Sequence, residues 1–118
     1  MVAEILWRCD VKRNLSGLIA KLVERLKDRY QPEKIILYGS YAYGTPDEAS
    51  DIDLLIIKDT ADRPIDRRIT VRRLVSDIRK KIPFSSLVLT PKELSGRLEI
   101  GDDFFIEITK KGKVIYER

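Results

Sequence analysis

The chain has 118 residues, of which 43% are apolar and 36% charged, and it carries a formal charge of +4. This length is enough for one hydrophobic core and too short for two, so we expect a single domain over residues 1–118. The absence of histidine excludes Ser-His and Cys-His nucleophiles and most zinc sites. The one cysteine, Cys9, excludes an internal disulfide and favours a reducing, cytoplasmic location.

The apolar segments are too short for a membrane protein. The longest uninterrupted apolar run is Leu54–Ile57, whereas a helix that spans the bilayer needs about 20 apolar residues. The N-terminus lacks a basic region followed by an apolar stretch, so we expect no signal peptide and no membrane partner.

The first half of the chain predicts a helix followed by two strands. Apolar residues recur at helical spacing up to Pro32, which predicts an amphipathic helix that ends before this proline; they are Val11, Leu15, Leu18, Ile19, Leu22, Leu26 and Tyr30. Ile35–Tyr38 is a short apolar run that indicates a buried strand. Asp51–Ile57 alternates at first and is then wholly apolar, as expected of a central strand buried on both faces.

The next segment predicts a helix, a strand and the start of another helix. Pro64 opens a helical pattern that Pro83 closes, with apolar positions at Ile65, Ile69, Leu74, Val75, Ile78 and Ile82. Phe84–Leu89 is a strand candidate. Thr90 can then cap a helix, with Pro91 at the first helical position and Glu93 completing a capping box.

The C-terminal part allows two interpretations. Phe104, Ile106 and Ile108 alternate, and with Val114 and Tyr116 they could form a hairpin. Residues 102–110 could equally be a short helix ended by Gly112, followed by a strand. With either ending, the fold class is α/β or α+β on a small sheet.

A turn after the first predicted strand has the features of a phosphate site. Gly39 follows that strand and Ser40 begins what resembles a helical turn. Glycine lets a phosphate approach the backbone closely, and the free amides at a helix start can then bind its oxygens. On its own, a Gly-Ser pair after a strand is usually an ordinary turn.

Two acids stand at the start of the next predicted strand. Asp51 and Asp53 are two residues apart, so both carboxylates project from one face of a strand. Such a pair suits Mg²⁺, which takes a few carboxylates and leaves its other positions to substrate phosphates and water. A lone Asp-x-Asp is usually a solvated strand end, but a phosphate turn followed by a carboxylate pair is typical of a site for metal-assisted phosphoryl or nucleotidyl transfer.

These residues resemble a known family. Gly39-Ser40-x-Ala42-x-Gly44, followed by Ser50-Asp51-Ile52-Asp53, is similar to the motif of the DNA polymerase β nucleotidyltransferase superfamily. The resemblance is closest to the minimal nucleotidyltransferases, small proteins often paired with a HEPN-domain toxin as its antitoxin. It also covers the first helix, the segment Val88–Leu94 and the ending Lys111–Glu117, and it favours the helix-then-strand interpretation of the C-terminus.

The resemblance implies a role for each motif residue. Gly39, Ser40, Gly44 and Ser50 would bind the nucleotide, with ATP as the expected substrate. Asp51 and Asp53 would be catalytic and would hold Mg²⁺. In the antitoxin members, the acceptor of the transferred AMP is a tyrosine hydroxyl on the toxin.

One position departs from the family pattern. The family supplies a third carboxylate from the following strand, and alignment on Leu89-Thr90-Pro91 places Ser85 there. Serine is a neutral, weak metal ligand and does not replace a carboxylate as a base. Three explanations stay open: a carboxylate from elsewhere (Asp47, Glu48 or one on a partner), slow transfer with one metal, or a domain that binds without catalysis. We expect nucleotide binding to survive and transfer to be weak or absent.

Other features have weaker interpretations. The second helix is rich in arginine, but no aromatic residues are interleaved, so we favour a solvated face over a nucleic-acid surface. Tyr41 or Tyr43 could stack on a base or pack inward. The opening segment with Trp7 could extend the helix or form a homo-oligomer contact, and the sequence does not decide.

Overall fold

The computed structural model describes residues 13–39, 42, 51–79 and 82–118. Four of the residues singled out above, Ser40, Gly44, Ser50 and Cys9, therefore lie outside the described residues, as do Tyr41, Tyr43, Asp47, Glu48, Trp7 and Val11.

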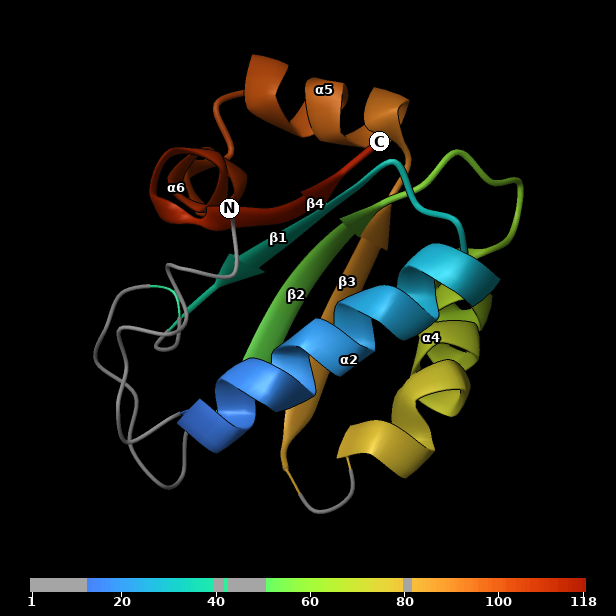
Figure 1. Cartoon of the computed structure of the whole chain (residues 1–118). Coiled ribbons are helices and arrows are strands. Elements are labelled where there is room, and N and C mark those ends of the chain that lie inside the picture. The colour runs from blue at the N-terminus through green and yellow to red at the C-terminus, as the bar shows by residue number, and fades with distance from the viewer. Residues whose placement is uncertain (1–12, 40–41, 43–50, 80–81) are drawn as a thin grey trace.

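A four-stranded mixed sheet forms the centre of the molecule, with strand order β3-β2-β1-β4 (Figure 1). The strands are β1 (Lys34–Tyr38), β2 (Ile52–Ile57), β3 (Phe84–Leu89) and β4 (Lys113–Glu117). β1 is antiparallel to both β2 and β4, whereas β2 and β3 run parallel. The parallel pair is joined through a helix, as a parallel crossover requires.

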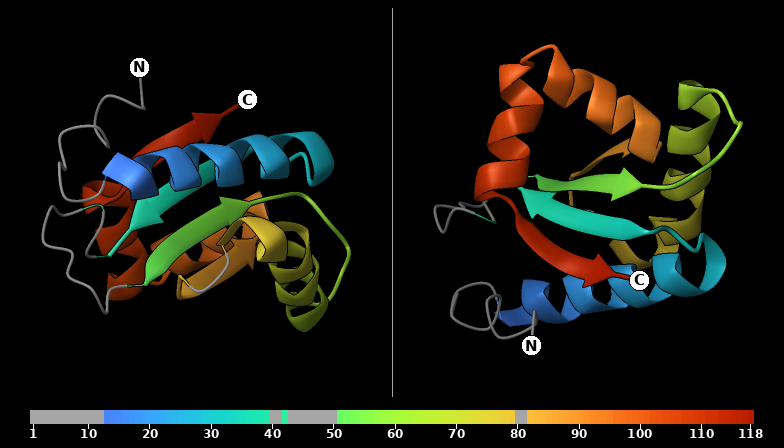
Figure 2. Two further views of the ribbon diagram at one scale, coloured as in Figure 1. Left: turned by 60° about the horizontal axis from the view of Figure 1, so that its bottom comes forward. Right: turned by 90° about the horizontal axis from the view of Figure 1, so that it is seen from above.

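Helices cover both faces of this sheet (Figure 2). Helices α2 (Arg13–Arg29) and α4 (Pro64–Arg79) pack on one face. Helices α5 (Pro91–Glu99) and α6 (Asp103–Lys111) pack on the other. The expected α/β architecture of a small mixed sheet flanked by helices is therefore confirmed.

The apolar run in β2 is buried from both sides, as its sequence predicted. Leu54 belongs to the cluster under α2 and α4, and the next residue, Leu55, belongs to the cluster under α5 and α6. Both side chains are fully buried. Successive residues of a strand point to opposite faces, so a strand covered on both faces needs apolar residues throughout.

Helix α4 buries only part of its predicted apolar stripe. Val75 is fully buried and Leu74 and Ile78 pack against the core, as predicted. Arg67, Val71 and Val75 face the interior, at the i, i+4, i+8 spacing of one helical face. Ile65 and Ile69 lie two residues off this stripe and are 52% and 45% exposed. They line an open groove beside β3, together with Arg68, Arg72, Phe84, Ser85 and Ser86.

One arginine of this helix is a structural residue. Arg67 is almost completely buried and donates hydrogen bonds to Glu93 Oε1 at 2.7 Å and to the backbone oxygens of Asp62 at 2.8 Å and Val88 at 3.2 Å. It thereby ties α4 to the end of β3 and the start of α5. Arg68, Arg72 and Arg73 are exposed, in keeping with a solvated face.

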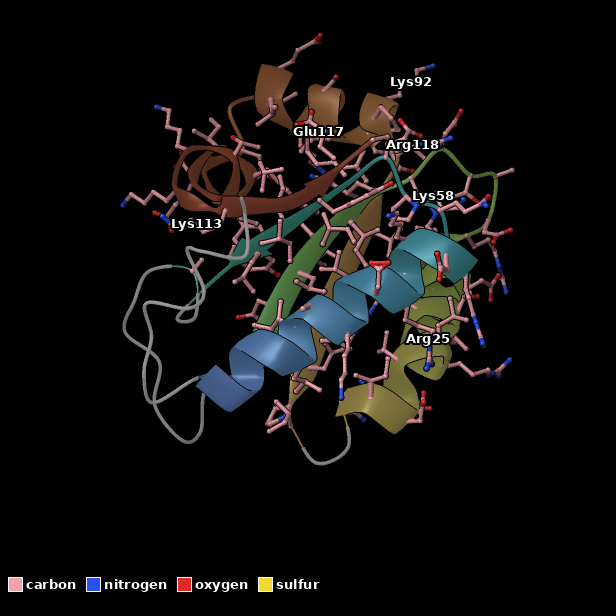
Figure 3. The ribbon with its side chains drawn as sticks, viewed as in Figure 1. Arg25, Lys58, Lys92, Lys113, Glu117 and Arg118 are labelled. Atoms are coloured by element: carbon pink, nitrogen blue, oxygen red, sulfur yellow. The ribbon has the colours of Figure 1, made fainter. Side chains whose placement is uncertain are left out.

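The two helices on the first face are joined by a further arginine. Arg25 of α2, labelled in Figure 3, lies next to α4. It donates to the Leu74 carbonyl and to the Asp77 carboxylate, both at 2.8 Å. The Asp77 side chain is largely exposed, so this pair positions the helices more than it stabilises them.

The start of α5 has the capping box that the sequence predicts. The backbone N–H of Glu93 donates to Thr90 Oγ1 at 3.1 Å, and the backbone N–H of Thr90 donates to Glu93 Oε1 at 2.9 Å. Pro91 occupies the first turn. Glu93 therefore serves the cap and the ion pair with Arg67 at once.

The C-terminal segment is a helix followed by a strand, so the hairpin interpretation is wrong. Phe105 and Ile108 are the buried residues of α6, and their spacing of three places both on one helical face. Gly112 ends the helix. A Cβ at this position would lie 2.5 Å from the Ile108 carbonyl oxygen and 2.6 Å from Cγ2 of Ile36, so only glycine lets α6 pass this close to β1.

No helix in the part of the chain that the structure describes has the length and apolar character to cross a bilayer.

Candidate functional site

The chain turns sharply where β1 ends. Gly39 directly follows β1 and has a φ of +78°, a conformation that glycine adopts without steric cost. The backbone N–H of Ala42 donates to the Gly39 carbonyl at 3.1 Å, and Ala42 is buried. The positive φ of Gly39 and this hydrogen bond therefore lie where the sequence predicted the phosphate turn.

The carboxylate of Asp53 lies against this turn. Asp53 pairs with Tyr38 in the β1–β2 register, and a Cβ built on Gly39 would collide with Asp53 Oδ2. Gly39 is therefore required here both by its φ and by the space that the carboxylate occupies. Gly39 of the phosphate turn and the second acid of the Asp-x-Asp pair are brought together, although they lie 14 positions apart in the sequence.

The two predicted metal ligands differ in environment. Asp51 is exposed and lies just before β2, whereas Asp53 is half-buried within the strand. Burial raises the pKa of the Asp53 carboxyl above its ordinary value, and the nearby charge of Asp51 raises it further. Mutual repulsion of this kind is relieved by a cation between the carboxylates.

Ser85 lies where a third carboxylate would complete the site. In the parallel β2–β3 pairing, Ser85 is the partner of Asp53, so the two side chains project from the same face of the sheet. Among the residues that the structure describes, no group of three or more acidic, histidine or cysteine side chains could hold a metal ion. The register thus agrees with the sequence alignment at this position.

The donors that are present fit Mg²⁺. Two carboxylates are the protein ligands that this ion takes when substrate phosphates and water supply the rest. We infer that Asp51 and Asp53 would hold the ion next to a phosphate at this turn.

Two aromatic residues beside this site were not recognised from the sequence. Tyr38 is the last residue of β1 and stands opposite Asp53. Its ring meets that of Phe104 in α6 edge-to-face, with centroids 5.9 Å apart. Tyr38 could have been noted because it directly precedes Gly39, but no sequence signal indicated that Phe104 would lie near it.

Comparisons with known proteins agree with this geometry. Residues 19–116 match the family described as "Nucleotidyltransferase domain". The chain is 33% identical over 112 residues to "Putative protein adenylyltransferase MJ1305" of Methanocaldococcus jannaschii, a match that covers 91% of this chain and 75% of the relative. A second protein of this organism, "Putative protein adenylyltransferase MJ0604", is 48% identical over 48 residues, which are 39% of this chain and 48% of that protein.

Two solved structures have a similar fold. One is "a putative nucleotidyltransferase from Sulfolobus solfataricus", with a TM-score of 0.59, 20% identity, and coverage of 86% of this chain and 79% of that one. The other is "the toxin-antitoxin with AMP-PNP", with a TM-score of 0.53, 20% identity, and coverage of 86% and 73%. At this identity the likeness supports the fold. The family match over residues 19–116 and the relative that is 33% identical show that the chain belongs to the nucleotidyltransferase domain family, and the names of its relatives agree with a minimal nucleotidyltransferase.

Proposed function

We propose that the chain binds ATP with Mg²⁺ and transfers AMP to a hydroxyl group of a partner protein, a HEPN-type toxin that it neutralises as an antitoxin. The observation that carries this proposal is the contact between the Gly39 turn and the Asp53 carboxylate. Relatives whose names describe protein adenylyltransferases support the reaction type. A neighbour in fold that is named as a toxin-antitoxin with a bound ATP analogue supports the partner and the nucleotide.

The reaction assigns a task to each residue of the site. Backbone amides of the turn after Gly39 would orient the phosphates, and Asp51 and Asp53 would hold Mg²⁺, which polarises the α-phosphate when bound. The acceptor oxygen forms a bond to the α-phosphorus while the bond to pyrophosphate breaks, and the hydroxyl proton leaves to a base. Ser85 cannot accept this proton as a carboxylate would.

The same serine favours a second candidate function. A domain with the phosphate turn and two carboxylates retains the means to bind a nucleotide with Mg²⁺. Among the residues that the structure describes, Ser85 stands beside Asp53, where the superfamily mechanism uses a third acid for transfer. In this alternative, the chain is a nucleotide- or partner-binding module that neutralises its partner by occupying it.

One experiment separates the two candidates. The neighbouring reading frame is first inspected for a short helical protein with an arginine-to-histidine motif of the HEPN type. That protein is then incubated with this chain, Mg²⁺ and ATP labelled at the α-phosphate. Label on the partner supports transfer, and a stable complex without label supports the binding module. If the partner carries no label and also forms no complex with this chain, the proposed partnership is wrong. Asp51→Asn is the control for metal dependence.

A further inference from the structure

We propose that Phe104 is a stacking platform for the base of the bound nucleotide. This inference rests on the proposed function. Phe104 is the second residue of α6, and 51% of its surface is exposed. Exposed aromatic rings offer a flat apolar face, and the flat face of a nucleobase is the part of a nucleotide that matches it.

The ring is held in place by two aromatic neighbours. Tyr38 meets it at an interplanar angle of 89°, with centroids 5.9 Å apart. Phe105 meets it at 78° and 5.1 Å, and Phe105 is itself buried in the core. A ring fixed on two sides loses little freedom when a ligand stacks on it, which favours binding.

The platform lies next to the phosphate site. Tyr38 directly precedes Gly39 and is the strand partner of Asp53, so the Tyr38 and Asp53 side chains share one face of the sheet. That face is the one covered by α6, because Tyr38 packs in the cluster that contains Phe105 and Ile108. The ribbon views show α6 beside the end of β1 (Figures 1 and 2). Phe104 therefore contacts Tyr38, the residue that stands opposite Asp53 in the β1–β2 pairing.

The chemistry of stacking predicts the nucleotide preference. Phe104 has no hydrogen-bonding group, and every nucleobase has a π-face, so stacking alone discriminates weakly between bases. We expect ATP and GTP to bind with similar affinity, within about fivefold of each other. Both should bind more tightly than inorganic tripolyphosphate, which has no base.

The test measures binding of these three compounds by calorimetry, with Mg²⁺ and the whole chain. Phe104→Ala should weaken binding of ATP and GTP by about 5- to 100-fold and leave tripolyphosphate unchanged. Phe104→Trp should retain the affinity for ATP and GTP. The matched control is Ile100→Ala, because Ile100 is 74% exposed and ends α5, just before α6. It should change none of the three affinities.

Three outcomes overturn the proposal, and they can be told apart. If Phe104→Ala binds ATP as the unsubstituted chain does, Phe104 does not stack on the base. If Phe104→Ala weakens tripolyphosphate as much as ATP, the residue acts through the structure of the phosphate site. If the unsubstituted chain binds none of the three, the proposed function fails and the platform fails with it. Thermal unfolding of each variant verifies that it is folded.

Discussion

The backbone at Gly39 carries two constraints that can be separated experimentally. Its positive φ excludes most side chains by conformation, and the Asp53 carboxylate excludes them by space. Gly101, between α5 and α6, has nearly the same φ, +76°, but a Cβ there would meet nothing within 4 Å. The two glycines therefore form a matched pair, because only Gly39 combines both constraints.

We predict that Gly39→Ala abolishes nucleotide binding whereas Gly101→Ala does not. Each substitution should lower the free energy of unfolding by about 1–2 kcal/mol, because alanine is strained at positive φ. The free energy of unfolding should fall further in Gly39→Ala than in Gly101→Ala, because the new Cβ displaces the Asp53 carboxylate. Chemical denaturation and calorimetry with MgATP measure the two effects. Equal ATP affinity in the two variants would contradict the role assigned to Gly39.

A second prediction concerns the position beside Asp53. Ser85→Asp should raise the rate of AMP transfer by on the order of 100-fold, because a positioned base contributes about this much. Without Mg²⁺, the added charge should destabilise the chain by repulsion from Asp53, and Mg²⁺ should restore the stability. Ser85→Asn is the control of similar size. If both variants fold and transfer AMP at the same rate, Ser85 does not explain weak catalysis.

The candidate site could be located in the sequence where its residues are close along the chain, and its role stays a prediction. Gly39, Asp51 and Asp53 were recognised because the motif is local, and Ser85 because an alignment reaches it. Phe104 could not be recognised, because its position beside Tyr38 depends on how α6 packs against β1. That packing is a tertiary contact without a local sequence signal.

At the scale of elements, Glu93 connects α4, β3 and α5. Its pKa lies below the ordinary value, first because Arg67 donates hydrogen bonds to its carboxylate and second because the backbone of Thr90 does. A carboxyl whose pKa is lowered in the folded state stabilises the protein above its unfolded pKa. This stabilisation is lost as the pH falls from about 4.5, the ordinary value, through the lower folded pKa.

We predict that Glu93→Gln flattens this acid dependence. Glutamine can still complete the capping box, so the cap is retained while the charge is removed. The variant should be less stable than the unsubstituted chain at pH 7, and the difference should shrink as the pH falls below 4.5. Urea denaturation at several pH values measures this difference in the free energy of unfolding. A difference that is the same at pH 7 and pH 3 would show that the charge does not contribute.

The orientation of α4 predicts which of its apolar residues contribute to the free energy of unfolding. Val71 is fully buried and Ile69 is 45% exposed, although both are β-branched residues of one helix. Val71→Ala should lower the free energy of unfolding by about 2 kcal/mol through lost apolar burial. Ile69→Ala should change it by less than about 0.5 kcal/mol. Chemical denaturation checks both values, and a larger effect at Ile69 would contradict the assigned orientation of α4.

The elements themselves were largely predictable, and the exceptions have physical causes. Strand β3 and the cap of α5 were predicted with the observed bounds, because each has a local signal. The ending was ambiguous because Phe104, Ile106 and Ile108 fit a strand while Phe105 and Ile108 fit a helix. The buried face of α4 was predicted correctly only in its C-terminal half, because in the N-terminal half Arg67 occupies an interior position that only a distant partner, Glu93, makes tolerable.

At the scale of the whole molecule, the two helical layers share one sheet. Val71 belongs to the first layer and Ile108 to the second, and β2 contributes side chains to both clusters. Neither layer can keep its core if the sheet is lost. This shared sheet is the reason to expect that the described residues unfold as one unit.

We therefore predict a single cooperative unfolding transition for the chain. In scanning calorimetry, the calorimetric and van't Hoff enthalpies should agree. Val71→Ala and Ile108→Ala should each move the whole transition to lower temperature, by about 4 °C per kcal/mol lost. Two transitions, of which each substitution moves only one, would show that the layers are independent.

The strand order also has a consequence for synthesis of the protein on the ribosome. β1 lies between β2 and β4, and Lys34 pairs with Glu117. The edge of β1 that faces β4 therefore cannot be fully paired within the chain until translation has reached residue 117. Until then, its N–H and C=O groups are available to strands of other nascent chains. The first strand to be made is among the last to be completed.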